Sequence, residues 1–189
     1  MKFIRYILFS ILIKEGPVMA ESRYSQYVIR KPAIIGQGGH LEIPDKYNLE
    51  GKVDTGPLVW VGKEIIPSAV TGLESGIISG DFTVGTGTGG GLAPHKHDDF
   101  DEMFLFMGTN PNDIEDLGAD VEFWLGEGDE LEKIEINTSA CIFVPAGLAH
   151  FPMTWKNVKR PCVFVVVSCS PFDPSTQRQE AASLEGRPR

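Results

Sequence analysis

The stretch PHKHDDFDEMFLF, residues 94–106, combines two histidines, a run of carboxylates and an apolar segment. His95 and His97 are separated by one residue, so on an extended chain both imidazoles point to the same side. Glu102 follows a short polar turn, and an antiparallel return would bring its carboxylate back to the two histidines. Imidazole and carboxylate ligands together suit first-row transition metals. The stretch therefore predicts half of a metal site rather than only a hydrated turn.

A second turn, VPAGLAHFP at residues 144–152, offers His150 as a further ligand. The remaining histidine, His40, lies in the glycine-rich segment GQGGHLEIP and is interpreted as a loop residue. The aspartates between His97 and Glu102 are interpreted as solvated charges or hydrogen-bond acceptors around the site.

Short apolar runs bounded by glycine or proline recur along the chain and predict β-strands. The chain has 21 glycines and 13 prolines, which suits a protein with many turns. No segment shows a helical pattern long enough for a parallel βαβ arrangement. Many short strands without intervening helices predict an all-β sandwich or barrel. The predicted strands are residues 57–62, 64–67, 75–85, 102–108, 120–126, 132–136, 140–147 and 162–168.

The first histidine stretch resembles the first motif of the cupin superfamily. The family pattern is a glycine, an HxH pair, a glutamate and a second glycine. This chain has Gly89, then His95 and His97, then Glu102 and Gly108, with one residue fewer before the last glycine than the family pattern. Counted from Asp101 instead of Glu102, both spacings fit, so Asp101 stays an alternative to Glu102.

The second histidine stretch resembles the second cupin motif, a glycine followed by PxGxxH and an asparagine. Pro145, Gly147 and His150 match its centre. Ser139 stands in place of the leading glycine, and Thr154 stands in place of the asparagine.

The resemblance covers residues 57–168 and implies an antiparallel jelly-roll barrel (a double-stranded β-helix) with a metal inside one end. It also implies a homodimer, which single-domain members often form by exchanging an N-terminal strand. The metal ligands that the resemblance implies are His95, His97, Glu102 and His150. The metal would be one divalent ion of Fe, Mn, Ni, Co, Cu or Zn per chain, with Fe slightly favoured.

Charge and cysteine content restrict the partners. The formal net charge is −9, which argues against nucleic acid or an anionic membrane surface as the main partner. No apolar run is long enough for a good membrane span. Three cysteines without a CxxC pair do not indicate a disulfide scaffold.

The chain ends are set apart from the predicted barrel, residues 55–170. Residues 1–20 are interpreted either as a weak signal peptide, which would make the protein secreted or periplasmic, or as translated upstream sequence before a true start at Met19, which would make it cytoplasmic. Residues 21–54 are expected to form an arm that could take part in dimer formation. Residues 171–189 are polar and are expected to form a flexible tail.

The resemblance favours a metal-dependent enzyme acting on a small organic substrate. A metal with four protein ligands keeps open positions, which suits either a dioxygenase-type oxidoreductase or a Lewis-acid isomerase, decarboxylase or lyase. The sequence offers no spare acid–base group in the barrel and no identified catalytic residue, and this favours O₂ chemistry. A non-catalytic small-molecule-binding protein is the third alternative. The aromatic residues that could line an apolar pocket are Phe104, Phe106, Phe143 and Phe151.

Overall fold

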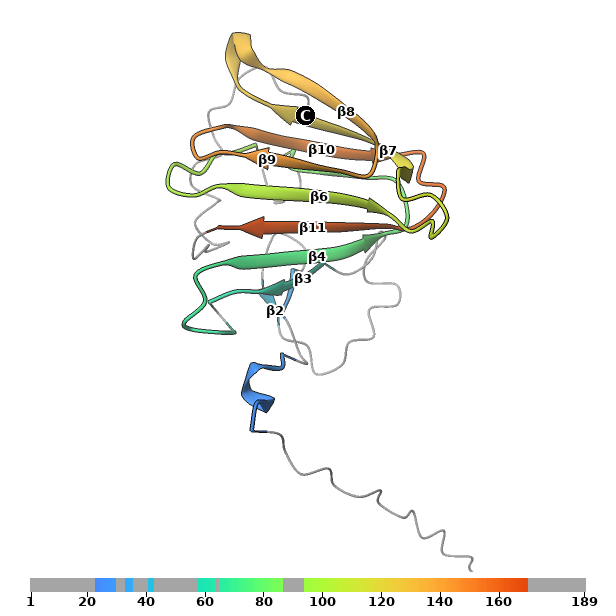
Figure 1. Ribbon diagram of the computed structural model, residues 1–189. Coiled ribbons are helices and arrows are strands. Elements are labelled where there is room, and N and C mark those ends of the chain that lie inside the picture. The colour runs from blue at the N-terminus through green and yellow to red at the C-terminus, as the bar shows by residue number, and fades with distance from the viewer. Residues whose placement is uncertain are drawn as a thin grey trace, which may run out of the picture. The chain divides into compact units, whose positions relative to one another are not determined.

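A computed structural model gives the fold of the chain (Figure 1). The residues it describes are 23–29, 33–35, 41–42, 58–63, 65–86 and 94–169. The chain divides into two compact units, Met1–Arg30 and Lys31–Arg189. In the first unit the described part is a short 3₁₀ turn, η1, at Ser25–Tyr27. The predicted tail, residues 171–189, and the segment of residues 1–20 lie outside the described residues.

The second unit consists of two antiparallel sheets, and the structure describes no α-helix in it. Eleven strands are described, and the only other regular element there is a 3₁₀ turn, η4, at Gly128–Glu130. The seven-stranded sheet has the order β2 (Leu41–Glu42), β1 (Ala33–Ile35), β3 (Leu58–Val61), β4 (Gly72–Ile78), β11 (Cys162–Ser168), β6 (Glu102–Gly108) and β9 (Ala140–Val144). The four-stranded sheet has the order β5 (Phe82–Val84), β10 (His150–Lys156), β7 (Asp116–Leu125) and β8 (Glu132–Thr138).

This arrangement confirms the all-β, jelly-roll prediction. Strands distant in sequence, such as β4 and β11, lie side by side in the sheet (Figure 1). Two short strands of the predicted arm, β1 and β2, extend the same sheet beyond β3. Among the described residues, no helix has the length and apolar character needed to cross a bilayer.

Alternating burial explains why the central strands form where they do. On β6, the odd-numbered side chains face out while Glu102, Phe104 and Phe106 are buried. β11 shows the same alternation, with Cys162 and Phe164 among its buried residues. A strand with one buried face has its register fixed, because a slip of one residue would turn the apolar side chains to water.

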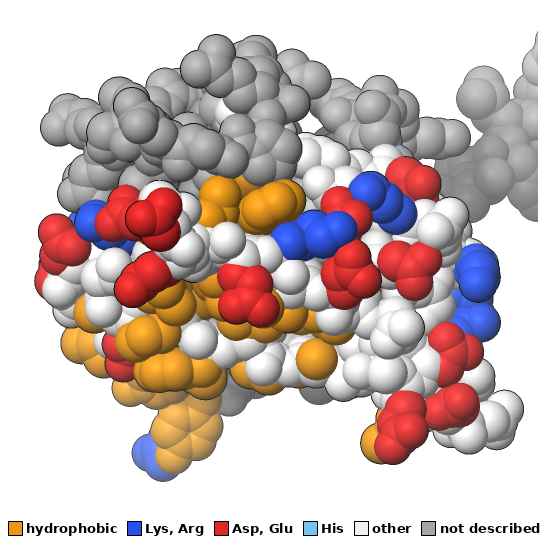
Figure 2. All heavy atoms as spheres, turned by 90° about the horizontal axis from the view of Figure 1, so that it is seen from above, with side chains coloured by type: hydrophobic (Ala, Val, Ile, Leu, Met, Phe, Trp, Pro, Cys, Tyr) orange, Lys and Arg blue, Asp and Glu red, His pale blue; other side chains and the backbone are white. Residues whose placement is uncertain are grey.

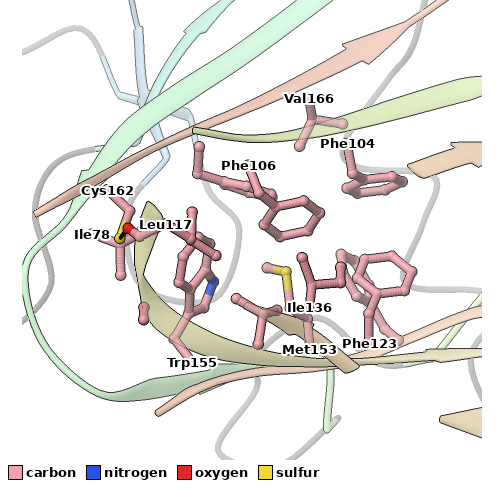
Figure 3. Packing of buried hydrophobic residues seen from close by; sticks show 14 of the residues in the cluster. Ile78, Phe104, Phe106, Leu117, Phe123, Ile136, Met153, Trp155, Cys162 and Val166 are labelled. Carbon is pink, nitrogen blue, oxygen red and sulfur yellow. Dashed lines mark hydrogen bonds between the residues drawn. The ribbon is translucent and has the colours of Figure 1, made fainter. Parts of the chain in front are cut away.

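The core lies between the two sheets and is mainly aromatic (Figure 3). Phe106 on β6 lies 5.4 Å from the ring of Trp155 on β10, measured between ring centroids. Phe104 meets Phe123 on β7 edge-on at 5.1 Å. At one end of the core the buried Cys162 thiol donates a hydrogen bond to the Leu117 carbonyl, drawn dashed in Figure 3.

Two strand predictions were wrong. The run at residues 64–67 is not a strand: in its described part the chain turns, and the backbone N–H groups of Ile65 and Ile66 both donate to the Gly62 carbonyl. Two isoleucines between a glycine and a proline are too few to make a strand. Conversely, β10 was not predicted, because Pro152 and an irregular register hide its alternation.

Candidate metal centre

Backbone pairing brings the two histidine stretches together. His95 and His150 form an isolated antiparallel bridge, in which each N–H donates to the other residue's carbonyl at 3.1 and 2.9 Å. The Gly147 N–H donates to the His97 carbonyl at 2.6 Å. The turn at residues 145–147 therefore holds the first stretch beside the start of β10, and all three imidazoles meet at one end of the two sheets.

A bulge aims His150 inward. The register between β10 and β7 shifts between His150 and Met153, and both residues are buried although regular alternation would place them on opposite faces. Phe151, within the bulge, has a φ of +73°, which is unusual for a residue with a side chain. Such local strain is found most often at functional sites.

Glu102 begins β6 and completes the cluster. Its Oε2 lies 3.1 Å from Nε2 of His150 and 3.3 Å from Nε2 of His97. Its Oε1 accepts a hydrogen bond from the Ser168 hydroxyl at 3.0 Å. One carboxylate oxygen is thus held by the neighbouring strand β11, while the other is directed at the histidines.

The four side chains form a compact buried group. One ligand atom from each of His95, His97, Glu102 and His150 lies within 4.8 Å of the others. All four residues are at most 9% exposed. Nδ1 of His150 lies 3.3 Å from the Leu148 carbonyl, which can only accept, so this nitrogen carries the proton and Nε2 is available as a ligand. The cluster could therefore hold a metal ion.

The electrostatics of the cluster fit a cation. Burial alone would raise the pKa of the Glu102 carboxyl, but the polar contacts and charge of His150 and His97 outweigh burial and hold that pKa well below its usual range. Within the described residues, Oε2 of Glu102 and Nε2 of His150 are buried without a hydrogen bond. Buried polar atoms of this kind are costly unless they are satisfied, and a metal ion among them would satisfy both.

Asp101 has a different partner. Its carboxylate accepts a hydrogen bond from the Ala146 N–H at 2.9 Å, and its carbonyl accepts one from the Cys169 N–H at 3.0 Å. The structure brings Glu102 into the cluster and leaves Asp101 bound to the turn that precedes His150. Asp98 and Asp99 are exposed, as expected for solvated charges.

Three of the four predicted pocket phenylalanines face inward. Phe104 lies 5.4 Å from the His150 ring, and Phe151 lies 5.0 Å from the same ring. Phe106 is fully buried farther along β6, against Trp155. The prediction for Phe143 was wrong: it is 56% exposed, because it pairs with the outward-facing Met103 across β9 and β6.

A second carboxylate faces the interior and was missed in the sequence. Glu74 on β4 has the same strand parity as the buried Ile78, and it lies between the inward residues Trp60 on β3 and Val166 on β11. The next inward row of the sheet contains Ser168 and Glu102. Burial, with a contribution from the Glu102 charge, raises the pKa of the Glu74 carboxyl from 4.5 to about 7.

Glu74 predicts a pH dependence of stability. Its folded pKa of about 7 exceeds the ordinary 4.5, so the unfolded chain loses this proton first and stability falls as the pH rises between these values. In metal-free protein, Glu74→Gln should therefore gain on the order of 2 kcal/mol relative to wild type between pH 5 and pH 8. Denaturant unfolding at both pH values measures this, and a constant difference between the two proteins would contradict it.

Ser168 is a further residue that the sequence did not reveal. Ser168→Ala removes the hydrogen bond to Oε1 of Glu102 and should weaken metal affinity by roughly 10–100-fold, because the carboxylate loses its orientation. Competition with a coloured chelator measures the affinity. Ser75→Ala, on the outer side of the neighbouring strand β4, is the matched control. Equal affinities in the two variants would show that the hydroxyl does not support the ligand.

Comparison with known proteins gives structural likeness only. No family model and no curated protein matches the chain. Among solved structures, the chain is similar to oxalate oxidase in complex with glycolate, with 13% identity, a TM-score of 0.45, and coverage of 67% of this chain and 57% of the other. It is also similar to Bacillus subtilis oxalate decarboxylase (10%, TM-score 0.44, 64% and 27%) and to CapF with 3-isopropenyl-tropolone (16%, 0.42, 66% and 31%).

The match thus spans little more than half of the oxalate oxidase chain and under a third of the other two. At these identities and TM-scores, the fold assignment comes from the strands and register of this chain itself. Two antiparallel sheets in a jelly-roll order, with three histidines and a glutamate gathered on the matching motif positions, define a cupin-type protein.

Proposed function

We propose that this protein is a metal-dependent enzyme acting on a small organic substrate, with dioxygenase-type oxidation as its first candidate reaction. The observation that supports it is the buried cluster of three imidazoles and one carboxylate beside an aromatic interior. When bound, the metal would supply Lewis acidity or redox chemistry at open coordination positions. The ligands would be His95, His97, Glu102 and His150.

The chain's own residues have separate tasks in this proposal. The Ser168 hydroxyl orients Glu102, and the Leu148 carbonyl fixes the proton of His150. Phe104 and Phe151 pack against the His150 ring and keep water from that side. A dry site strengthens every charge interaction inside it, which suits a reaction that develops charge on the substrate.

Glu74 favours a second candidate, a Lewis-acid isomerase, decarboxylase or lyase. The sequence favoured O₂ chemistry because it offered no spare acid–base group. The structure places Glu74 on the inner face of β4, in the row beside the one that contains Glu102. A carboxyl with a pKa of about 7 can give or take a proton near neutral pH. Reactions that form or protonate a carbanion need such a group, whereas oxidation by O₂ can proceed without it.

The experiment begins with metal analysis of protein purified without added metal. The proposal expects a near-stoichiometric first-row metal that is lost in His97→Ala and retained in Lys96→Ala, whose side chain bonds the exposed Glu127 instead. Absence of metal from the wild type, also after anaerobic reconstitution with Fe(II), would overturn the metalloenzyme proposal.

The loaded protein is then screened against phenols, diketones, thiols and carboxylic acids for O₂ uptake and for exchange of substrate hydrogen with deuterated water. O₂ uptake that Glu74→Gln leaves intact supports the dioxygenase. Deuterium exchange or decarboxylation whose kcat falls roughly 100-fold or more in Glu74→Gln supports the Lewis-acid enzyme. Metal binding with neither activity, together with tight binding of one compound, indicates the non-catalytic alternative.

A further inference from the structure

The outer face of the seven-stranded sheet is apolar. We call the outward side chains of β3, β4, β11, β6 and β9 the apolar face. Its most exposed members are between 37% and 56% exposed, and between them lie three outward valines of β11. These exposed members are Leu73, Ile77, Met103, Leu105, Met107 and Phe143. The strand that carries Glu102 is thus apolar on its outer side as well.

No charged side chain interrupts the apolar face along these described strands. The outer face of the other sheet is the internal contrast. There Glu122 pairs with Lys133 at 3.1 Å and with Lys156 at 2.7 Å, and Lys133 also pairs with Glu135. Seen from above, acidic and basic side chains are spread together over the molecule (Figure 2). In a chain with 23% charged residues, a five-strand face without charge is not an average solvated surface.

The apolar face has the size of an interface. Strands lie about 4.8 Å apart and rise about 3.4 Å per residue, so these five strands cover roughly 500 Å² in projection. A stable dimer buries about 800 Å² on each partner, and the relief of the side chains and the surrounding loops supply the remainder. Isolated apolar residues on a surface are common, but a contiguous patch of this extent marks a contact site.

We propose that the apolar face is the interface of a homodimer in which the same face of a second copy packs against it. The net charge of −9 selects this pairing. A basic partner would need acidic groups to recognise, and this face has none. Two copies can bring their uncharged faces together without opposing like charges, whereas the charged face of the other sheet cannot do so. A two-fold axis makes one face complementary to itself.

This inference is independent of the proposed function. It also differs from an exchange of N-terminal strands, because the interface would consist of the barrel sheet itself. Leu105 lies near the middle of the apolar face, where it pairs with Val165 of β11 and Cys141 of β9. A charge introduced there would be buried against the partner at a large cost.

The test is the mass of the full chain in solution, measured by light scattering and sedimentation over a range of protein concentrations. Wild type should be a dimer. Leu105→Glu and Leu105→Lys should each weaken dimerisation at least 100-fold, and an equimolar mixture of the two should form dimers again. Asn137→Glu adds the same charge on the outer side of β8 and should leave the dimer intact. Far-UV circular dichroism and metal content verify that each variant is folded.

Ile77→Glu, at a more exposed position of β4, is the second variant for the case that Leu105→Glu does not fold. A monomeric wild type at all concentrations would overturn the proposal. A dimer that survives both charged variants would do so too, and its loss on removal of residues 1–30 would assign the interface to the N-terminal unit instead.

Discussion

A divalent transition metal added to metal-free protein should raise the free energy of unfolding by about 4 kcal/mol when its free concentration is about 1,000 times the dissociation constant. The folded chain gathers four ligand atoms within 4.8 Å, and the unfolded chain does not. Binding energy of this kind becomes folding energy. Denaturant unfolding with and without metal measures the effect, and a chelator should reverse it.

Two conservative variants decide which carboxylate takes part. Glu102→Gln should abolish the stabilisation by metal, because an amide is a weaker ligand than the carboxylate beside His97 and His150. Asp101→Asn should retain it, since the asparagine carbonyl can still accept the Ala146 N–H. If Asp101→Asn loses the effect and Glu102→Gln keeps it, the alternative ligand that the motif spacing allows is the correct one.

The fold was predictable where burial alternates and not where the backbone is irregular. β6 and β11 were predicted from their apolar runs, and the structure confirms both. β10 was missed since its bulge places His150, Phe151, Pro152 and Met153 all in the interior, which erases the period of two. That irregularity is the feature that directs His150 at the cluster, so the least predictable strand is also the one that positions a ligand.

The candidate site was predictable in its histidines and glutamate, whose spacing the two motifs fix. The supporting residues were not, because Ser168 and Glu74 are distant in sequence and meet the site only through strand pairing. A signal for Glu74 did exist: it has the parity of Ile78, so a charged residue occupies an inward position of a strand. The same parity argument would have placed Phe143 outside.

β11 joins the three functional parts of the molecule. Its inner side supplies Ser168 to the cluster and Phe164 to the core, and its outer side supplies valines to the apolar face. A strand that is apolar on both sides is expected at the centre of a buried sheet. Here one side is covered by the second sheet, which is why the uncovered side points to a partner.

Phe106→Ala should lower the free energy of unfolding by about 3–5 kcal/mol. The Phe106 side chain is fully buried, and its ring lies 5.4 Å from those of both Trp155 and Phe164. Removing the ring leaves a cavity between the two sheets, which the surrounding strands can close only in part. Urea unfolding of metal-free protein measures the loss.

Phe143→Ala makes the same chemical change on the outer side of the neighbouring strand β9. It should cost about 1 kcal/mol or less, since 56% of that residue is already exposed to solvent. Both variants are compared at one protein concentration, because association of the apolar face would make stability depend on it. Equal losses would mean that β6 and β9 do not have the inner and outer faces described, and with them the position of Glu102 beside the histidines would fail.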